Sequence, residues 1–279
     1  MYKTKHNKQI TTALLLAAGI GHRLQPLTNN MPKCLTKVNE KEILAHLVHN
    51  LHQHNFRRLI VVVGHLEQSI RKFLDKNAGN LTVEYIVSPK YRTTNNLYSL
   101  WMVRNKIKDP FLLLESDLVF APSQLKNMLY PDRIAVSHIM PWMNGTTITV
   151  DPDIPHNVTA FNLDASSANT DDISYKTVNI YSFSRQTWKR IAKRLDYFIS
   201  VGRENDYYET VFAEMIADGS LNFQSVLFEK ELWYEIDTVE DLYECEQNFI
   251  NQALPEVKLK VTQANETTIT DQGKLYNNL

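Results

Sequence analysis

The stretch LLLAAGIGHRLQPLTNNMPKCL, residues 14–35, is the most informative part of the sequence. It starts as a hydrophobic run typical of a buried strand and then breaks at Gly19 and Gly21, two of only 8 glycines in the chain. Arg23 and Lys33 follow within a few residues. Backbone N–H groups at such a turn point into open space and hold phosphate well. The loop therefore combines a phosphate-sized backbone nest with two cations.

The spacing of this loop excludes two common phosphate-binding motifs. A dinucleotide fingerprint reads G-x-G-x-x-G, and here no third glycine follows Gly21. A P-loop needs its lysine directly after a glycine, whereas Lys33 follows Pro32. A Rossmann dehydrogenase and a P-loop enzyme are both disfavoured.

The first half of the chain alternates buried strands with amphipathic helices. We expect strands at 12–19, 58–65, 81–88 and 110–120, and helices at 41–55, 66–77 and 96–107. Such alternation favours an α/β fold, a doubly wound and mostly parallel sheet with helices on both faces.

The second half differs in character. From about residue 132 short strand-like runs are separated by turns, which indicates that the sheet is mixed. Helices are expected at 185–200 and 207–219, and a strand, a turn and a helix at 229–252. Beyond this the sequence is polar, so we expect one domain over residues 1–252 and a polar tail or linker over 253–279.

Composition limits the classes of partner. The net charge of −1 gives no argument for nucleic-acid binding, and no apolar run approaches membrane-spanning length. Cys34 and Cys245 are too far apart in the sequence for a metal motif or a disulfide framework. A reduced, cytoplasmic setting is therefore expected.

The loop resembles the signature of the sugar-nucleotidyltransferase superfamily, G-x-G-x-R-L-x-P-L-T-x-x-x-P-K-x-L. The sequence matches every fixed position: Gly19, Gly21, Arg23, Leu24, Pro26, Leu27, Thr28, Pro32, Lys33 and Leu35. The resemblance implies a Rossmann-like nucleotidyltransferase fold, with a nucleoside triphosphate held by Ala17, Ala18, Gly19 and Gly21. It also implies that Arg23 and Lys33 neutralise the phosphates as catalytic cations.

Acidic residues at the ends of two strands are candidate Mg²⁺ ligands. LLLESD ends in Glu115 and Asp117, and LWYEID ends in Glu235 and Asp237. Nucleotidyl transfer requires a hard cation on the triphosphate. The resemblance places the metal on Asp117 and Asp237. Glu115, which we assign to the nucleotide site, and Glu235 are interpreted as groups that support the metal ligands or as polar residues of the strand face. The alternative is that these aspartates cap the helices that follow.

Other segments indicate a branch of the superfamily. NN-x-YSL and YEIDTVEDL resemble the bacterial choline-phosphate cytidylyltransferases, so CTP is the expected donor. By that likeness Ser88, Asn95 and Asn96 lie near the base and ribose, since amides can both donate to and accept from cytosine. Asn95 and Asn96 also suit the N-cap of the next helix.

The acceptor is expected to be a small phosphonate or phosphate. WMNGT and KTVNIYSFS look like cytidylyltransferases that activate 2-aminoethylphosphonate, which we place ahead of phosphocholine. Asn179, Asp206 and Glu209 could accept hydrogen bonds from its ammonium, and Lys176 could meet the phosphonate. A solvated helix face is the alternative for Asp206 and Glu209.

Other functions stay open at this stage. One is a sugar-1-phosphate nucleotidyltransferase that uses UTP or dTTP, and another is a catalytically silent nucleotide-binding regulator. Trp142 and Trp233 are interpreted as packing residues. The resemblance also leaves open a homodimer, and a fusion to or pairing with another enzyme of the same pathway.

Overall fold

A computed structural model describes residues 9–140, 143–163 and 173–253. Trp142 and residues 254–279 of the expected tail lie outside these ranges, and Ala253 is the last residue of helix α6. Both cysteines are buried and free. No helix in the described part of the chain has the length and apolar character needed to cross a bilayer.

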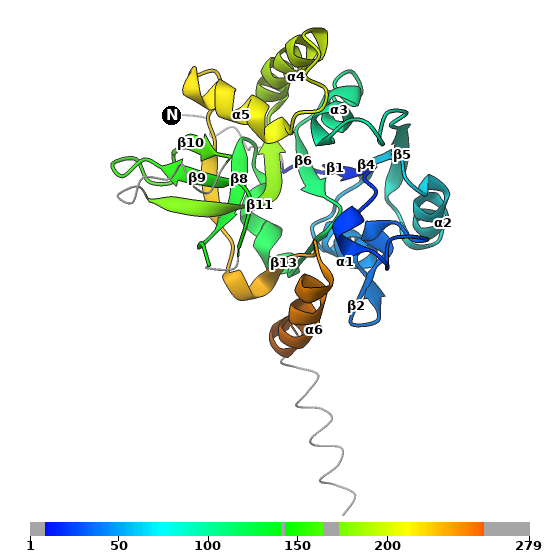
Figure 1. The fold of residues 1–279 in the computed structure, drawn as a ribbon. Helices are drawn as coiled ribbons and strands as arrows, with labels where there is room; N and C mark the ends of the chain where they lie inside the picture. Colours follow the sequence, from blue (N-terminus) through cyan, green and yellow to red (C-terminus); the bar gives the residue numbers. More distant parts are fainter. Residues whose placement is uncertain (1–8, 141–142, 164–172, 254–279) are drawn as a thin grey trace, which may run out of the picture.

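Four parallel strands form one half of the sheet. They are β1 (Thr12–Ala17), β4 (Arg58–Val63), β5 (Thr82–Val87) and β6 (Phe111–Glu115), in the order β6-β1-β4-β5. Figure 1 shows them side by side across the middle of the molecule. Their carboxyl ends meet at one edge, where ligands of such sheets bind. Strand β1 leads into the loop at residues 19–33, which we call the glycine loop.

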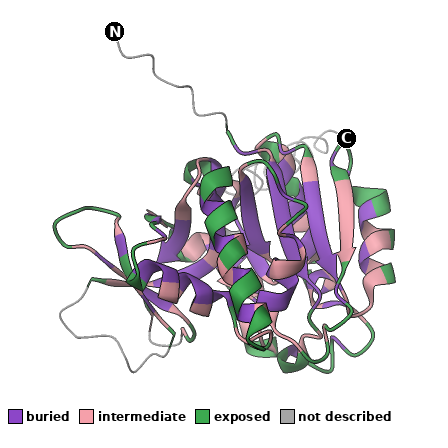
Figure 2. Cartoon of the chain, turned by 90° about the horizontal axis from the view of Figure 1, so that it is seen from above, coloured by how far each residue is buried: buried purple, intermediate pink, exposed green. Residues whose placement is uncertain are grey.

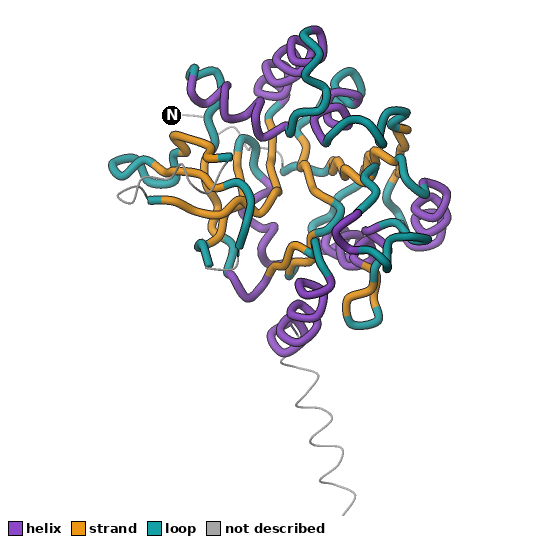
Figure 3. The backbone as a smooth tube through the Cα atoms, viewed as in Figure 1, coloured by secondary structure: helices purple, strands orange, loops and turns teal. Residues whose placement is uncertain are grey.

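Helices cover both faces of the sheet, as the alternation predicted (Figure 3). One face carries α1 (Ile43–Gln53) and α2 (Glu67–Asn77). The other carries α3 (Asn96–Met102), α4 (Arg185–Ser200) and α5 (Tyr208–Ala217). In Figure 2 the buried strands lie between helices whose outer sides are exposed. The fold class is therefore confirmed.

Strand β1 shows why residues 13–17 are all apolar. Leu14 and Leu16 belong to the cluster beneath α3, α4 and α5, whereas Ala13 and Leu15 belong to the cluster beneath α1 and α2. All six residues of β1 are buried. Alternate side chains of a strand point to opposite faces, so a strand covered on both faces reads as a continuous hydrophobic run.

The other half of the sheet is organised around one long strand, β11 (Ser174–Phe183). It pairs antiparallel with β6, with β8 (Arg133–Ser137) and with β9 (Thr147–Val150). Strand β10 (Val158–Asn162) extends the sheet antiparallel beyond β9, and β12 (Gln224–Leu227) pairs parallel with β8. The sheet is mixed, as expected.

A bulge interrupts β11 near the parallel strands. The register with β8 shifts between Thr177 and Tyr181, and Asn179 between them has φ 59°. A left-handed residue in a bulge redirects its side chain and locally breaks the strand ladder. Asparagine tolerates this conformation better than most residues.

Two expected elements are shorter in the structure. The strand expected at 110–120 breaks after Glu115, and its remainder, β7 (Leu118–Phe120), pairs instead with β13 (Trp233–Glu235). The helix expected at 96–107 ends at Met102, because the chain must turn before the next strand. The break at residues 116–117 places Asp117 in a turn.

The last helix and several short elements complete the described chain. Helix α6 (Val239–Ala253) packs near the segment after the glycine loop, in a small cluster that includes Leu24, Val38 and Phe249. The short elements are β2 (Lys37–Val38), β3 (Lys41–Glu42) and the 3₁₀ helices His22–Leu24, Lys33–Leu35, Pro122–Leu129 and Lys230–Leu232.

Gly64, directly after β4, is expected to be required for packing. A Cβ there would lie 2.8 Å from the Ala18 carbonyl oxygen and 2.8 Å from Cβ of Tyr91. Since one of these neighbours is backbone, Gly64→Ala should lower the free energy of unfolding by about 1–3 kcal/mol in urea denaturation. Gly19→Ala is the matched control, because no atom lies within 4 Å of its Cβ position. Equal losses in both variants would contradict this account.

Candidate active site

The glycine loop begins where β1 ends. Gly21 has φ 73°, a conformation that favours glycine, and a Cβ there would crowd Lys33 and Thr28 at 3.2 Å. The Thr28 hydroxyl donates to the Gly21 carbonyl oxygen at 2.8 Å, which closes the loop on itself. Gly19 faces open space. The loop is therefore rigid at Gly21 and accessible at Gly19.

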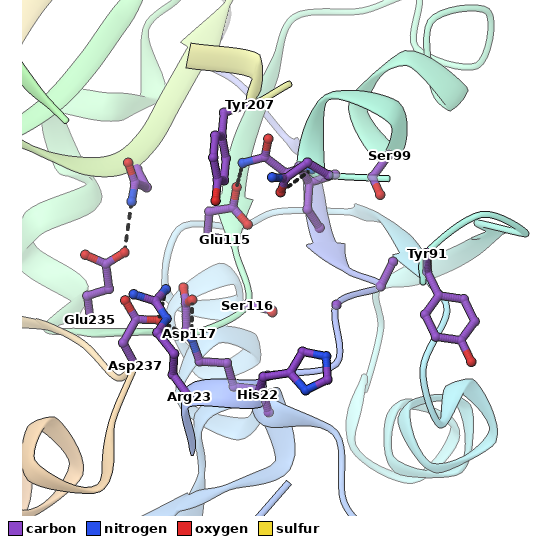
Figure 4. Close-up of a pocket in the computed structure, with 18 of the residues that line it drawn as sticks. His22, Arg23, Tyr91, Ser99, Glu115, Ser116, Asp117, Tyr207, Glu235 and Asp237 are labelled. Carbon is purple, nitrogen blue, oxygen red and sulfur yellow. Dashed lines mark hydrogen bonds and ion pairs between the residues drawn. The ribbon is translucent and has the colours of Figure 1, made fainter. Parts of the chain in front are cut away.

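A cavity of about 430 Å³ opens above this loop, and we call it the main cavity. It extends from the loop and α3 to β11, α5 and β13. Figure 4 shows Tyr91 at one end and Glu235 at the other, with Glu115 and Asp117 between them. Its lining includes most of the predicted residues: Ala18, Gly19, Gly21, Arg23, Lys33, Asn95, Asn96, Glu115, Asp117, Asn179, Glu209 and Asp237.

An ionic cluster joins three distant segments at the base of the main cavity. The Lys33 ammonium lies 2.7 Å from Asp117 Oδ2 and 2.5 Å from Asp237 Oδ1. Arg23, largely exposed, lies 2.8 Å from the same Asp237 oxygen. Burial alone would lower the pKa of Lys33, but the two carboxylates more than offset this and hold its pKa above the usual value. Lys33 is therefore charged at every physiological pH.

The carboxylate of Asp237 is not used as a helix cap. The first turn of α6 is closed by Thr238 and Asp241: Asp241 Oδ2 accepts from the Thr238 backbone N–H at 2.7 Å, and Thr238 Oγ1 accepts from that of Asp241 at 3.2 Å. This reciprocal pair resembles a capping box. It leaves the Asp237 side chain free to face the cavity.

The carboxylates at the base of the main cavity would fit a magnesium ion. Asp117 Oδ1 is buried and has no hydrogen-bond partner among the described residues. No group of three or more His, Cys, Asp or Glu able to hold a metal occurs in the described ranges. Mg²⁺ is commonly held by one or two carboxylates, with phosphates and water completing its shell. Asp117 and Asp237 would supply the two carboxylates.

Removal of the Lys33 charge is expected to make this carboxylate pair respond to Mg²⁺. In Lys33→Met the two aspartates lose the cation between them and repel each other. The melting temperature should fall below that of the unaltered protein, and millimolar MgCl₂ should raise it more in the variant. The measurement is a thermal melt at fixed ionic strength with NaCl as the control salt. An equal Mg²⁺ response in both proteins would contradict this geometry.

The predicted base-binding residues have structural roles that were only partly expected. Asn95 caps α3 by accepting from the Asn96 backbone N–H at 3.0 Å. The Asn96 amide donates to Glu115 Oε1 at 3.4 Å and accepts from the Tyr208 backbone N–H at 3.0 Å, so it joins α3, β6 and α5. Ser88 is buried and, like Ala17, is not part of the cavity lining.

Several lining residues were not among the predicted site residues. They are Leu16, His22, Tyr91, Thr94, Ser99, Ser116 and Tyr207. Ser116 could have been found from its place between Glu115 and Asp117. Tyr91 and Tyr207 are brought to the cavity by loops, for which periodicity gives no signal.

The predicted acceptor residues are divided between two cavities. A second cavity of about 410 Å³ lies on the other side of Asp237 and is lined by Lys176, whereas Asn179 lines the main cavity. Glu235 lines both. Its Oε1 accepts from the Asn179 amide at 3.1 Å, and its Oε2 lies 3.5 Å from the Lys176 ammonium. Trp233 is buried, as expected, and also lines the second cavity.

The two carboxylates near the start of α5 differ in environment. Asp206 is outside the lining of both cavities and forms an ion pair with Arg203 at 2.7 Å. Glu209, in the first turn of α5, is buried and lines the main cavity. A position on a solvated face was the alternative interpretation of both acids. It describes Asp206 but not Glu209.

Three acids that line the main cavity, Glu115, Glu209 and Glu235, have pKa values above the ordinary value of a glutamate. Burial raises the pKa of Glu209 to about 7. Burial also raises the pKa of Glu115, and the neighbouring carboxylates of Asp117 and Glu209 raise it further. The pKa of Glu235 is raised by burial and partly restored by Lys176. Ionising the three carboxyl groups together costs free energy because of their burial and because they repel each other. A cationic ligand beside them would favour their charged forms.

Glu209 should make the stability of the ligand-free protein depend on pH. Because its native pKa lies above the ordinary 4.5, its contribution is fully present below pH 4.5 and is lost as pH rises through about 7. Glu209→Gln removes this loss, while Glu115, Glu235 and Lys176 still face the position. The variant should therefore gain about 2 kcal/mol relative to the unaltered protein between pH 5 and pH 8.

The measurement is urea denaturation at several pH values. Glu214→Gln is the matched control, since Glu214 lies on the same helix and forms ion pairs with Arg194 and Arg203. If the free energy of unfolding changes with pH by the same amount in Glu209→Gln and in the unaltered protein, Glu209 does not have the raised pKa assigned to it.

Residues 12–136 match the model of the family described as nucleotidyl transferase. A CMP-5'-(3-aminopropyl)phosphonate synthase of Streptomyces rubellomurinus is 29% identical over 246 residues, which cover 85% of this chain and 38% of that protein. The 2-aminoethylphosphonate cytidylyltransferase of Lancefieldella rimae is 24% identical over 251 residues, which cover 88% and 95%.

The choline-phosphate cytidylyltransferase of Streptococcus pneumoniae is 32% identical over 120 residues, which cover 43% of this chain and 48% of that protein. A solved structure of the CTP:phosphocholine cytidylyltransferase from this organism has a TM-score of 0.71 at 24% identity and covers 86% of this chain and 99% of its own. This likeness shows the fold. The chain spans less than half the length of the two relatives with 38% and 48% coverage.

Proposed function

We propose that this chain, whose residues 12–136 match the nucleotidyl transferase family model, is a cytidylyltransferase. It would transfer CMP from CTP to a small amino-alcohol phosphonate or phosphate and release pyrophosphate. We favour 2-aminoethylphosphonate as the acceptor and place phosphocholine next. The observation that carries the proposal is the cluster of Lys33, Arg23, Asp117 and Asp237 beside the glycine loop. The names of the relatives support cytidine as the nucleoside and an aminoalkyl phosphonate as the acceptor.

The glycine loop would bind the triphosphate. The open space at Gly19 lets phosphate oxygens approach the backbone N–H groups, where no side chain intervenes. Arg23 is exposed enough to turn from Asp237 toward a phosphate. Lys33 is held at the base of the cavity and needs only to exchange a carboxylate for a phosphate oxygen. The cluster is therefore a binding site for a polyanion whose cations are already positioned.

The transfer step would be a direct in-line displacement. An oxygen of the acceptor's phosphonate or phosphate attacks the α-phosphorus of CTP, and the bond from that phosphorus to the pyrophosphate oxygen breaks. The acceptor oxygen is already an anion, so no side chain has to remove a proton from it. Mg²⁺ on Asp117 and Asp237 would supply charge neutralisation at the triphosphate. Catalysis then consists mainly of positioning and electrostatic stabilisation.

A screen for pyrophosphate release tests this proposal. Each of the four common nucleoside triphosphates is combined with 2-aminoethylphosphonate, phosphocholine, phosphoethanolamine and several hexose 1-phosphates. We expect release with CTP and an amino-alcohol phosphonate or phosphate. Release only with UTP or dTTP and a hexose phosphate would replace the proposal with a sugar-1-phosphate nucleotidyltransferase, and binding of CTP without any release would replace it with a regulator.

In the same assay, Asp117→Asn should lower turnover by about 100-fold or more, because it removes one of the two carboxylates at the triphosphate. Asp153→Asn is the control, since Asp153 is an exposed loop residue outside both cavities. Turnover of Asp117→Asn close to that of the control would contradict the assigned role.

A further inference from the structure

We propose that Glu209 binds the ammonium group of the acceptor and makes the site selective for a primary amine over a quaternary one. This inference rests on the proposed function and names the class of acceptor. The acceptor would be a short ω-aminoalkyl phosphonate or phosphate whose nitrogen carries N–H donors. A trimethylammonium group of the same chain length would be rejected.

The first observation is a carboxylate oxygen without a partner. Glu209 is only 6% exposed, yet its side chain lines the main cavity. Among the described residues its Oε2 has no hydrogen-bond partner, and Glu209 forms no ion pair there. A buried carboxylate that is neither paired nor fully hydrogen-bonded is costly. A ligand that donates N–H bonds to this oxygen would remove that cost.

The second observation is the set of acceptors around the same end of the cavity. Asn179, held in its left-handed conformation by the bulge in β11, and Glu235 both line the cavity wall. Lys176 forms no ion pair with Glu209, because its ammonium donates to the Thr177 carbonyl oxygen at 2.9 Å and lies 3.5 Å from Glu235 Oε2. Its charge only partly offsets the effect of burial on the pKa of Glu209. This end of the cavity therefore has an excess of oxygen acceptors over cations.

The third observation is the distribution of aromatic rings. The aromatic rings among the described lining residues of the main cavity are those of His22, Tyr91 and Tyr207. Tyr91 is at the end of the cavity opposite Glu235 (Figure 4), and Tyr207 is 58% exposed. A quaternary ammonium is usually bound by several aromatic faces. A primary ammonium, in contrast, donates hydrogen bonds, and Glu209 Oε2 is an acceptor that has no partner among the described residues.

The test compares two acceptors that differ only in N-methylation: 2-aminoethylphosphonate and its N,N,N-trimethyl analogue. With the unaltered protein and saturating CTP, kcat/KM for the trimethyl compound should be about 10- to 100-fold lower, since bonds to a charged group are lost. Glu209→Gln should lower kcat/KM for the primary amine by a similar factor and reduce the preference. The affinity for CTP, measured by calorimetry, should stay unchanged. Glu214→Gln, on the same helix, should keep the full preference.

The outcomes separate the two proposals. Equal kcat/KM for both acceptors with the unaltered protein would overturn the inference without any variant, as would a full preference in folded Glu209→Gln. If neither amine is a substrate while a hexose 1-phosphate is, the proposed function itself fails. Thermal melts of each variant show whether a loss of activity reflects unfolding.

Discussion

The contact on which the site depends is the one between the Lys33 ammonium and the carboxylates of Asp117 and Asp237. Lys33 is separated along the chain from Asp117 by 84 residues and from Asp237 by 204 residues. The three side chains are held in one place by elements with independent packing: the glycine loop, the turn after β6 and the start of α6. Without a polyanion, Lys33 and Arg23 balance the charges of the two aspartates. With a polyanion bound, the cations could move to the phosphates and the aspartates could hold a metal.

The second constraint is the burial of acids at the far end of the same cavity. Burial raises the pKa values of Glu209 and Glu115, and the neighbouring carboxylates of Asp117 and Glu209 raise that of Glu115 further. Such an arrangement lowers the stability of the free protein, and natural proteins retain it mainly where a ligand compensates. Under the proposed function, Lys33 and Arg23 would meet the triphosphate, and Glu209 would meet the ammonium group of the acceptor.

The sequence predicted the fold, and most of the residues that it proposed for the nucleotide and the metal lie together in the main cavity. Continuous apolar strands such as β1 have an unambiguous pattern, and the spacing of Gly19, Gly21, Arg23 and Lys33 is local. The acceptor end was harder to predict because it depends on tertiary context. The left-handed conformation of Asn179 arises from a register shift between strands, and the burial of Glu209 arises from the packing of α5 against the sheet. Neither leaves a periodic signal.

The crystal structure of the complex with CTP and Mg²⁺ tests the central claim most directly. The account predicts that the triphosphate lies on the loop at residues 19–33, with Lys33 moved from the two aspartates to a phosphate oxygen and the metal on Asp117 and Asp237. A complex in which Lys33 still bridges both aspartates while the nucleotide binds elsewhere would contradict it.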